Sequence, residues 1–580
     1  MVQLTKNRLI SKIDNLETRL LVMEEKMRRL CEAVEEKGRR MLRNAKRTAD
    51  SEREEKALLC QWLNGFLVSC PSEPRLSSMD FTFARFALNV AMASARTRTK
   101  EMLDAGAPDF LVGMLSNPNE LVTGPAVLAL AQMAQHDICR HAIVQAGGVP
   151  PLVLLCFKNQ SPAVLTQVCI ALALLSQYAP NKPVIAGKGG VAAMVRLLEG
   201  FVAEDRVTVE VAGRALAGLV NVMHGSDANR GLAEECGLAS PTIKLMDAVN
   251  DDFLLVQACR ALGNMAFRNQ YTALRLLEAG ADRAICELVR DSDKTRHNDM
   301  MEAGFIALAN LANNRLNQAH VGAGSTIELA LAVCQHCRSP RVVRPAALAL
   351  SSLCYKCQAN KTRCAALDAE SVLLELGLSW GAPGEDDETR SQQSSESMSG
   401  GTVSLPEGMV DDQCVAAAQA ICCLAILAQH PTNALALKEL GAMTQLTELI
   451  EDSEHNKVLI AAAKAVVSLI PEPGALVRAV RNGRTPEVEE AGAYEALVRV
   501  KEWVFGQKAV PPWLVFALDL LGCKVDEIEA RLAEDGPGAF RKPEEFFAPS
   551  EFFEEGNTPI PPDVTLANEE DFGGMLFHVF

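Results

Sequence analysis

Residues 257–300 read QACRALGNMAFRNQYTALRLLEAGADRAICELVRDSDKTRHNDM, and this stretch decides the fold. Apolar segments alternate in it with polar residues and with a glycine turn at Gly280. The lengths of the apolar segments and the breaks between them are typical of short helices that pack on one another. We expect helices at 257–267, 273–277 and 283–289, and a polar loop at 290–293.

The same pattern returns along most of the chain at a nearly fixed interval. The alanine that opens the phrase ALGNMA recurs at Ala87, Ala129, Ala171, Ala215, Ala261, Ala307, Ala349, Ala420 and Ala465. Successive copies are 42 to 46 residues apart, except for one interval of 71. A turn glycine recurs at a similar interval, at Gly106, Gly147, Gly189, Gly237, Gly280, Gly324 and Gly441. Self-similarity at this period predicts a helical solenoid.

The repeated phrases resemble the armadillo repeat. The resemblance lies in the glycine turn before a leucine-rich helix, as in AGAPDFLVGML, AGGVPPLVLLC and KGGVAAMVRLL, and in the phrases ALGNMA and ALANLA. It covers residues 81–470, and the glycine turn disfavours the related HEAT repeat. The resemblance implies an all-α, right-handed α-solenoid of about eight to nine repeats that binds proteins and has no catalytic activity.

The remaining sequence divides around this solenoid. We expect a coiled coil and basic helix at 5–56, the repeats at 58–470 with a disordered insertion at 381–410, a helical cap at 471–535 and an acidic tail at 541–580. The insertion accounts for the 71-residue interval, because it is rich in Ser, Gly and acidic residues. Its serines are candidates for phosphorylation. The tail combines acidic residues with seven phenylalanines, which favours a segment that becomes ordered on a partner or on the chain's own groove.

The N-terminal segment has apolar residues in a regular 4-3 spacing. They are Leu9, Ile13, Leu16, Leu20, Met23, Met27, Leu30 and Val34. Such a seam needs a partner helix, so it indicates a homodimer or pairing with another coiled coil. The alternative is a helix that caps the first repeat. The basic stretch at 37–56 is better interpreted as a solvated helix face than as a localisation signal, because glutamates are interleaved with its cations.

Composition excludes several classes of function. A net charge of −16 argues against a nucleic-acid-binding protein, which needs cations to neutralise phosphates. We expect no secretory signal and no membrane span, because the longest apolar run, at 415–428, is too short to cross a bilayer. Eighteen cysteines without a signal sequence indicate free thiols in a reducing compartment.

No motif in the sequence supports catalysis or a cofactor. Cys334, Cys337, Cys354 and Cys357 have the spacing of a paired-knuckle zinc site. We interpret them as buried structural cysteines, because the repeat places the two pairs at different helix ends, about 20 Å apart. Residues 187–190 lack the Ser or Thr that a phosphate loop requires. We therefore expect no metal, no cofactor and no enzymatic activity.

The armadillo resemblance implies a concave groove lined by the third helix of each unit, with the residue three after the repeat alanine projecting into it. Those positions are Gln132, Leu174, Gly218, Asn264, Asn310, Ser352, Cys423 and Ser468. Neighbouring polar residues are Arg214, Arg260, Arg268, Asn314 and Lys356. We expect the asparagines to bind the backbone of an extended peptide and the cations to favour acidic ligands. The alternative is a solvated face without a ligand.

Three functions remain open on these observations. The first is an adaptor that presents its groove to a partner's peptide segment. The second is a docking component of the cytoskeleton or of cilia, and the third is a regulator of a small GTPase or a myosin chaperone. All three place the protein in the cytoplasm.

Overall fold

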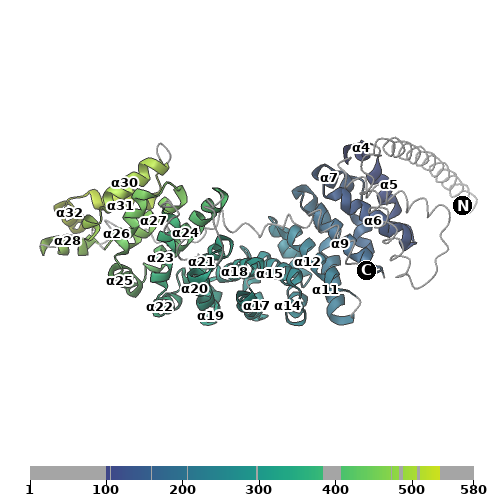
Figure 1. Ribbon diagram of the computed structural model, residues 1–580, viewed down its shortest axis with the longest axis horizontal. Helices are drawn as coiled ribbons and strands as arrows, with labels where there is room; N and C mark the ends of the chain where they lie inside the picture. Colours follow the sequence, from purple (N-terminus) through teal and green to yellow (C-terminus); the bar gives the residue numbers. More distant parts are fainter. Residues whose placement is uncertain are drawn as a thin grey trace, which may run out of the picture. The chain divides into compact units, whose positions relative to one another are not determined.

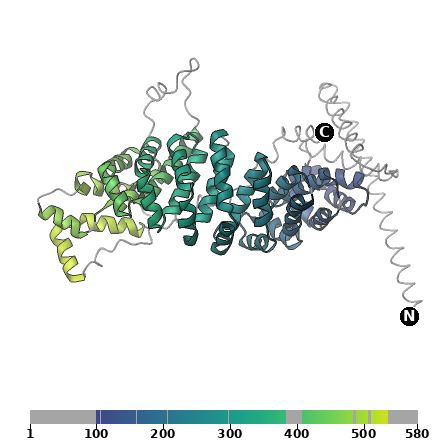
Figure 2. The ribbon, with the colours of Figure 1, turned by 90° about the horizontal axis from the view of Figure 1, so that it is seen from below.

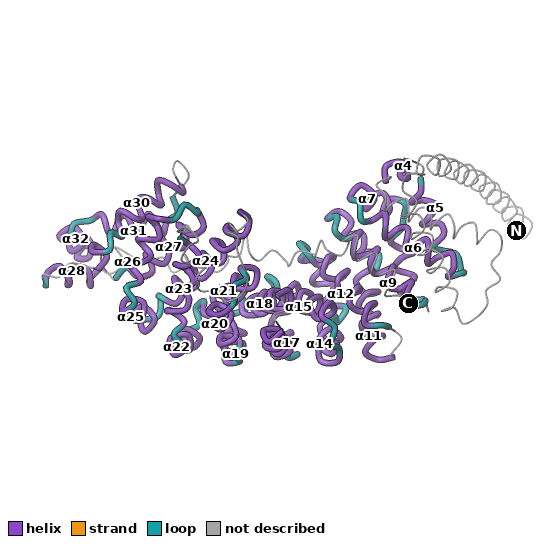
Figure 3. The backbone as a smooth tube through the Cα atoms, in the orientation of Figure 1, coloured by secondary structure: helices purple, strands orange, loops and turns teal. Residues whose placement is uncertain are grey.

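The fold is described here from a computed structural model. Its described residues are 99–535, with gaps at 105, 159, 205–206, 296–297, 383–406, 472, 483–486 and 506–509. These residues form helices and no strand (Figures 1 and 3), which confirms the all-α class. The predicted coiled-coil seam, the basic stretch at 37–56 and the acidic tail at 541–580 lie outside the described residues, as does most of the insertion.

The described helices belong to two compact units. Among the described residues, the first unit runs to Leu197 and includes residues up to Gly218 of α12, and the second contains the rest of α11 and residues 219–535. The helices of the first unit, including the two that continue into the second, are α4 Thr99–Asp104, α5 Ala107–Met114, α6 Glu120–Ala134, α7 Asp137–Gln145, α8 Val149–Phe157, α9 Pro162–Leu175, η1 Ala179–Asn181, α10 Lys182–Gly187, α11 Gly190–Glu204 and α12 Val209–Met223.

The second unit repeats one order of helices: a nine-residue helix, a second helix and a long helix. Its repeats are α13 Asp227–Glu235, α14 Ala239–Ala248 and α15 Asp252–Ala266; α16 Gln270–Glu278, α17 Ala281–Thr295 and α18 Asn298–Ala312; α19 Arg315–Ala323, α20 Thr326–His336 and α21 Pro340–Cys354; α22 Gln358–Ala366, α23 Ala369–Gly381 and α24 Glu407–Leu427; α25 Pro431–Glu439, α26 Ala442–Asp452 and α27 Asn456–Leu469. The long helices α15, α18, α21, α24 and α27 pack side by side in chain order (Figure 2).

After the last repeat the second unit continues with shorter helices. They are α28 Pro473–Arg481, α29 Glu487–Glu490, α30 Ala493–Val500, the π-helical turn Lys501–Phe505, α31 Pro512–Gly522 and α32 Val525–Asp535. Trp513 of α31 is buried, and the ammonium of Lys464 in α27 lies 5.9 Å from the centre of its ring. These helices therefore pack on the last long helix.

Two sequence-based boundaries are wrong. The predicted loop at 290–293 belongs to α17, because those residues include no glycine or proline and a helix tolerates polar residues on its outer side. Arg290 of this segment donates a hydrogen bond to the Ser325 hydroxyl at 2.6 Å. The predicted insertion at 381–410 is too wide, since α23 continues to Gly381 and α24 begins at Glu407.

The turn glycines take the left-handed backbone conformation that their position requires, with one exception. Gly280 has φ +81° and Gly441 has φ +65°, whereas Gly324 has φ −71°. The next repeat has no glycine at this turn, and Asp368 adopts φ +53° there. The backbone path is therefore conserved between repeats even where the residue is not glycine.

Glycines inside the helices have a different role, which is close packing. A Cβ atom on Gly304 of α18 would lie 2.3 Å from a methyl carbon of Val289 in α17. One on Gly377 of α23 would lie 2.6 Å from Ile421 in α24. The helices approach so closely that only glycine fits at these contacts.

Buried asparagines connect each repeat to the one before it. The third residue of the nine-residue helix is asparagine in most repeats, and Asn317, Asn360 and Asn433 are at most 3% exposed. The Asn360 amide donates to the Leu353 carbonyl at the end of α21 and to the Gln318 carbonyl of α19, both at 2.8 Å. The Asn317 amide donates in the same way to Leu311 and, in the preceding repeat, to Ala273.

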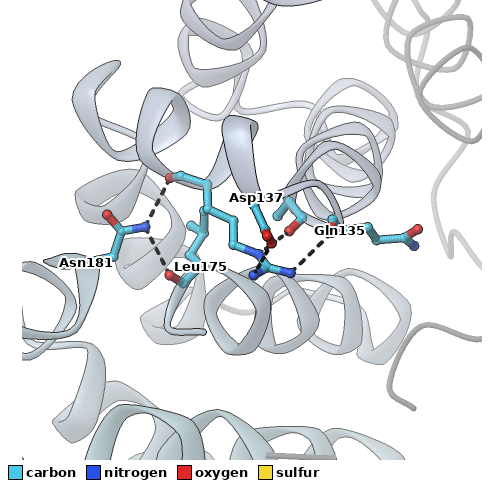
Figure 4. Close-up of polar contacts among 6 residues, drawn as sticks. Gln135, Asp137, Leu175 and Asn181 are labelled. Atoms are coloured by element: carbon cyan, nitrogen blue, oxygen red, sulfur yellow. Dashed lines mark hydrogen bonds and ion pairs between the residues drawn. The ribbon is translucent and has the colours of Figure 1, made fainter. Parts of the chain in front are cut away.

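The first unit has the same connection. Asn181 donates from one amide group to the Leu175 carbonyl at 3.0 Å and to the Arg140 carbonyl at 3.1 Å (Figure 4). Arg140 itself donates to the carbonyls of Ala134 and Gln135 and pairs with Asp137. A single side chain thus satisfies carbonyls at a helix end and fixes the register between repeats.

Most cysteines of the described residues lie in the interior as free thiols. Burial raises the pKa of Cys259, Cys334 and Cys422 to about 12. The Sγ atoms of Cys354 and Cys364 lie 3.4 Å apart, and no group of three or more metal-ligating side chains occurs among the described residues. The thiols therefore fill space as small apolar groups do.

We predict that replacing Asn360 by alanine lowers the free energy of unfolding by about 2 kcal/mol, because two buried carbonyls lose their donor. Asn360→Asp should be worse, since it sets a carboxylate oxygen against the same carbonyls. Urea unfolding followed by circular dichroism measures both changes. Gln358→Ala, at an exposed position of the same helix, is the control, and an equal effect of that control would contradict the assignment.

We also predict that Cys334 reacts with N-ethylmaleimide at pH 8 at least about 100-fold more slowly than Cys337, three residues away on the same helix end. Only the thiolate is nucleophilic, and burial suppresses it at Cys334. Mass spectrometry of peptides sampled over time measures the two rates. Both residues should react equally in urea, and equal rates in the folded protein would show that Cys334 is accessible.

Candidate partner-binding face

The positions that the sequence places in the groove are mostly buried. Asn264 is 0% exposed and Asn310 is 1% exposed, and the other described members of the set are buried except Ser468. Asn310 donates its amide hydrogen to the Gly263 carbonyl of the preceding long helix at 2.9 Å, and Asn264 donates to Val220 at 3.4 Å. The expectation that these asparagines face a peptide is therefore wrong: their amide groups join neighbouring long helices.

Asn314 also has a structural role. Its side chain accepts a hydrogen bond from the Leu316 amide, so it caps α19, and its amide group donates to the Gln270 carbonyl at 2.8 Å. With 4% of its surface exposed, it is not available to a ligand. Asn314 is therefore removed from the candidate site.

Arg268 and Lys356 lie at the turn between a long helix and the next nine-residue helix, and not on the exposed side of the long helices. Both residues precede a helix N-cap, at Asn269 and Cys357. Arg214 lies in the first unit on α12, where it is partly exposed. Its positive charge acts on Cys169, whose pKa burial nevertheless raises well above the ordinary value.

Most charged residues of the long helices in the second unit lie at other positions, where Arg260 and Lys464 are buried and the other charged members are partly or fully exposed. Relative to the repeat alanine, these are the residues eight, five and one before it, which share one helix face. We call this row the long-helix face; its charged and amide members are Arg260, Asp299, Glu302, Arg341, Arg344, Asp412, Gln419, Lys457 and Lys464. They include most of the charged residues in these otherwise apolar helices, and that pattern was available in the sequence.

Charges on the long-helix face alternate from one helix to the next. Arg260 is on α15, Asp299 and Glu302 are on α18, and Arg341 and Arg344 are on α21. Asp412 follows on α24, and Lys457 and Lys464 on α27. The sign therefore changes at every step along five stacked helices.

Part of this charge is neutralised within the chain. Arg341 pairs with Glu302 at 2.6 Å and with Asp299 at 3.1 Å. Burial raises the pKa of Glu302, while the charges of Arg341 and Arg260 oppose that rise. Arg260 thus faces a carboxylate, and the expected basic surface is in fact a mixed one.

Two charges of the long-helix face have no ion-pair partner among the described residues. Arg344 is partly exposed on α21 and Asp412 is exposed on α24. Ile306 of α18 and Gln419 of α24, at other positions of the face, are also partly exposed, and the Gln419 amide donates to the Ser351 hydroxyl at 3.3 Å. The face can therefore offer one cation, one carboxylate and apolar contacts to another molecule.

No single helix of the described part is long and apolar enough to cross a membrane. Two bent pairs of helices, α7 with α8 and α9 with the segment Ala179–Gly187, meet the criterion by length and composition alone.

Comparison with known proteins gives the fold and identifies one repeat. Residues 136–177, which contain α7, α8 and α9, match the Armadillo/beta-catenin-like repeat family. No curated protein matches the chain.

Among solved structures, an engineered protein is 22% identical, with a TM-score of 0.59 over 81% of this chain and 98% of its own. A designed armadillo repeat protein is also 22% identical, with a TM-score of 0.36 over 44% of this chain and 98% of its own. Another, solved with the peptide (KR)4, has the same identity, coverage and TM-score. The chain therefore has an all-α solenoid fold, and its residues 136–177 match an armadillo repeat.

Proposed function

We propose that this protein is a non-enzymatic scaffold that binds an extended segment of a partner protein on the long-helix face of its second unit. The armadillo repeat supports a role in protein interaction in general. The observation that carries the finer proposal is the alternation of charge over α15, α18, α21, α24 and α27, with Arg344 and Asp412 lacking a described partner.

The spacing of the face suits an extended chain. Packed helices lie about 8–10 Å apart, and an extended segment advances about 3.3 Å per residue. A bound segment therefore passes from one long helix to the next in about three residues. A partner with an acidic residue for Arg344 and a basic residue about three positions away for Asp412 would satisfy both charges.

The mixed charge changes the expected ligand. The sequence favoured an acidic peptide because it showed only the cations of the groove. In the folded chain Arg341 already forms ion pairs with Glu302 and Asp299. We therefore propose a partner segment that carries both signs of charge rather than an acidic one.

Docking to the cytoskeleton or to cilia, with a cytoplasmic location, is a second proposal for the same scaffold. Its basis is the predicted N-terminal coiled coil, which lies outside the described residues. Co-sedimentation of the full chain with microtubules in constant stoichiometry tests it, and absence of the protein from the pellet would exclude this role. Nucleotide-exchange and client-refolding assays test the third role, regulation of a GTPase or a myosin chaperone.

We predict that peptides selected from a random library by the full chain lose at least about tenfold in affinity when Arg344 is replaced by glutamate. Asp412→Lys should have a similar effect, because each change places a like charge opposite the ligand. Fluorescence anisotropy with the selected peptides measures the dissociation constants. The double variant should select a different set, with the order of charges reversed.

Arg283→Glu is the matched control, because this exposed arginine belongs to α17 and lies away from the long-helix face. It should leave the affinity unchanged. Selected peptides whose binding is insensitive to both Arg344 and Asp412 would show that the ligand lies elsewhere.

A further inference from the structure

A second surface follows the turns between the long helices and the nine-residue helices of the second unit. The buried asparagines place successive nine-residue helices next to one another. Asn314 donates to Gln270 at 2.8 Å, and Asn360 donates to Gln318 at 2.8 Å. The first turns of α16, α19 and α22 therefore form one continuous edge.

This edge is cationic and partly apolar. Arg268, Arg315 and Lys356 are exposed, and none of them has an ion-pair partner among the described residues. Beside them Tyr271 is 68% exposed and Leu316 is 73% exposed, among the most exposed large apolar side chains in the described chain. The edge thus presents three cations without ion-pair partners and two exposed apolar side chains.

The cations are held over aromatic rings. The Arg268 guanidinium lies 5.5 Å from the centre of the Phe267 ring, and the buried Arg230 guanidinium lies 5.2 Å from the same ring. The Lys356 ammonium lies 5.3 Å from the centre of the Tyr355 ring. The same phrase, an aromatic residue followed by a cation, therefore occurs at two turns that are two repeats apart.

Apart from the ring contacts, two features of the described fold are unfavourable at these positions. Arg268 and Lys356 have φ +52° and +54°, which costs a residue with a Cβ about 1 kcal/mol, whereas the preceding turn of this kind uses Gly225. A cation near a helix N-terminus is also unfavourable. The first turns of α16, α19 and α22 contain no acidic residue to offset it. The edge is therefore suited to an anionic, aromatic ligand.

We propose that this edge binds the acidic segment at residues 544–555 of the chain's own tail. The segment reads EEFFAPSEFFEE, so it has five glutamates, four phenylalanines and no cation. Its phenylalanines match the exposed Tyr271 and Leu316, and its glutamates match Arg268, Arg315 and Lys356. This ligand is distinct from the mixed-charge partner of the long-helix face, so each of the two proposals can be refuted without refuting the other.

The spacing within the segment supports this assignment. The phrase Glu-Phe-Phe begins at Glu545 and again at Glu551. Six extended residues span about 20 Å, and two repeats of stacked helices span about 16–20 Å. Because the tail follows the C-terminal helices, Glu545 pairs with Lys356 at the later turn, and Glu551 pairs with Arg268 at the earlier one.

The test uses a fluorescent peptide of residues 541–558 and two forms of the full chain. One form is unaltered, and in the other Phe546, Phe547, Phe552 and Phe553 are replaced by serine. The peptide should bind the serine form at least about tenfold more tightly, because the native tail competes for the edge. Equal affinity for both forms, or no binding to either, would overturn the proposal.

Variants of the edge in the serine form locate the contact. Arg268→Glu with Lys356→Glu should weaken peptide binding at least tenfold, and Arg283→Glu should not. A Glu545→Lys peptide should recover affinity for Lys356→Glu but not for Arg268→Glu, whereas Glu551→Lys should do the reverse.

Loss of binding in Arg344→Glu instead would place the segment on the long-helix face and refute binding at the edge. Light scattering that shows a dimer of the unaltered chain, dissociated by the serine substitutions, would assign the tail to a second copy and refute intramolecular binding.

Discussion

The second unit depends on one buried interaction that recurs along the chain, the amide of an asparagine at the third position of most nine-residue helices. One donor group satisfies two carbonyls of the preceding repeat, one in its long helix and one in its nine-residue helix, as Asn317 and Asn360 show. Buried carbonyls must be paired, so this contact sets both the turn that joins two repeats and the register between them. Asn310 adds a second connection between long helices.

This constraint accounts for the location of the candidate surfaces. Because the asparagines and small residues are used inside the stack, charged residues occupy the positions that remain on the outer side of the long helices. The ion pairs of Arg341 with Asp299 and Glu302 lie between α18 and α21. Partly exposed pairs of this kind contribute little stability. The proposed binding of a partner would explain the alternating charges better than stability does.

The turns obey the same register but have a different chemistry. Gly225, Arg268 and Lys356 share a left-handed backbone conformation, which glycine adopts without cost and arginine or lysine does not. An unfavourable backbone at a cation that also lies near a helix N-terminus indicates selection for charge at that point rather than for stability. The two surfaces differ in the ligand they suit: mixed charge on the long helices, and acidic and aromatic groups at the turns.

The sequence by itself determined the all-α class, the period and the main positions of the helices. An alanine that recurs mostly every 42 to 46 residues marks positions that pack closely, and a glycine that recurs mostly every 41 to 48 residues marks the turns. It did not determine the direction of Asn264, Asn310 and Asn314. A polar residue in an apolar helix can face a ligand or a neighbour's carbonyl, and only the approach of adjacent repeats decides between the two. It also could not show that Arg260 faces Glu302 and that Arg341 pairs with Glu302, or that α16 and α22 bring Arg268 and Lys356 to one edge. Those relations join residues about 40 or more positions apart, and the tertiary structure alone places them together.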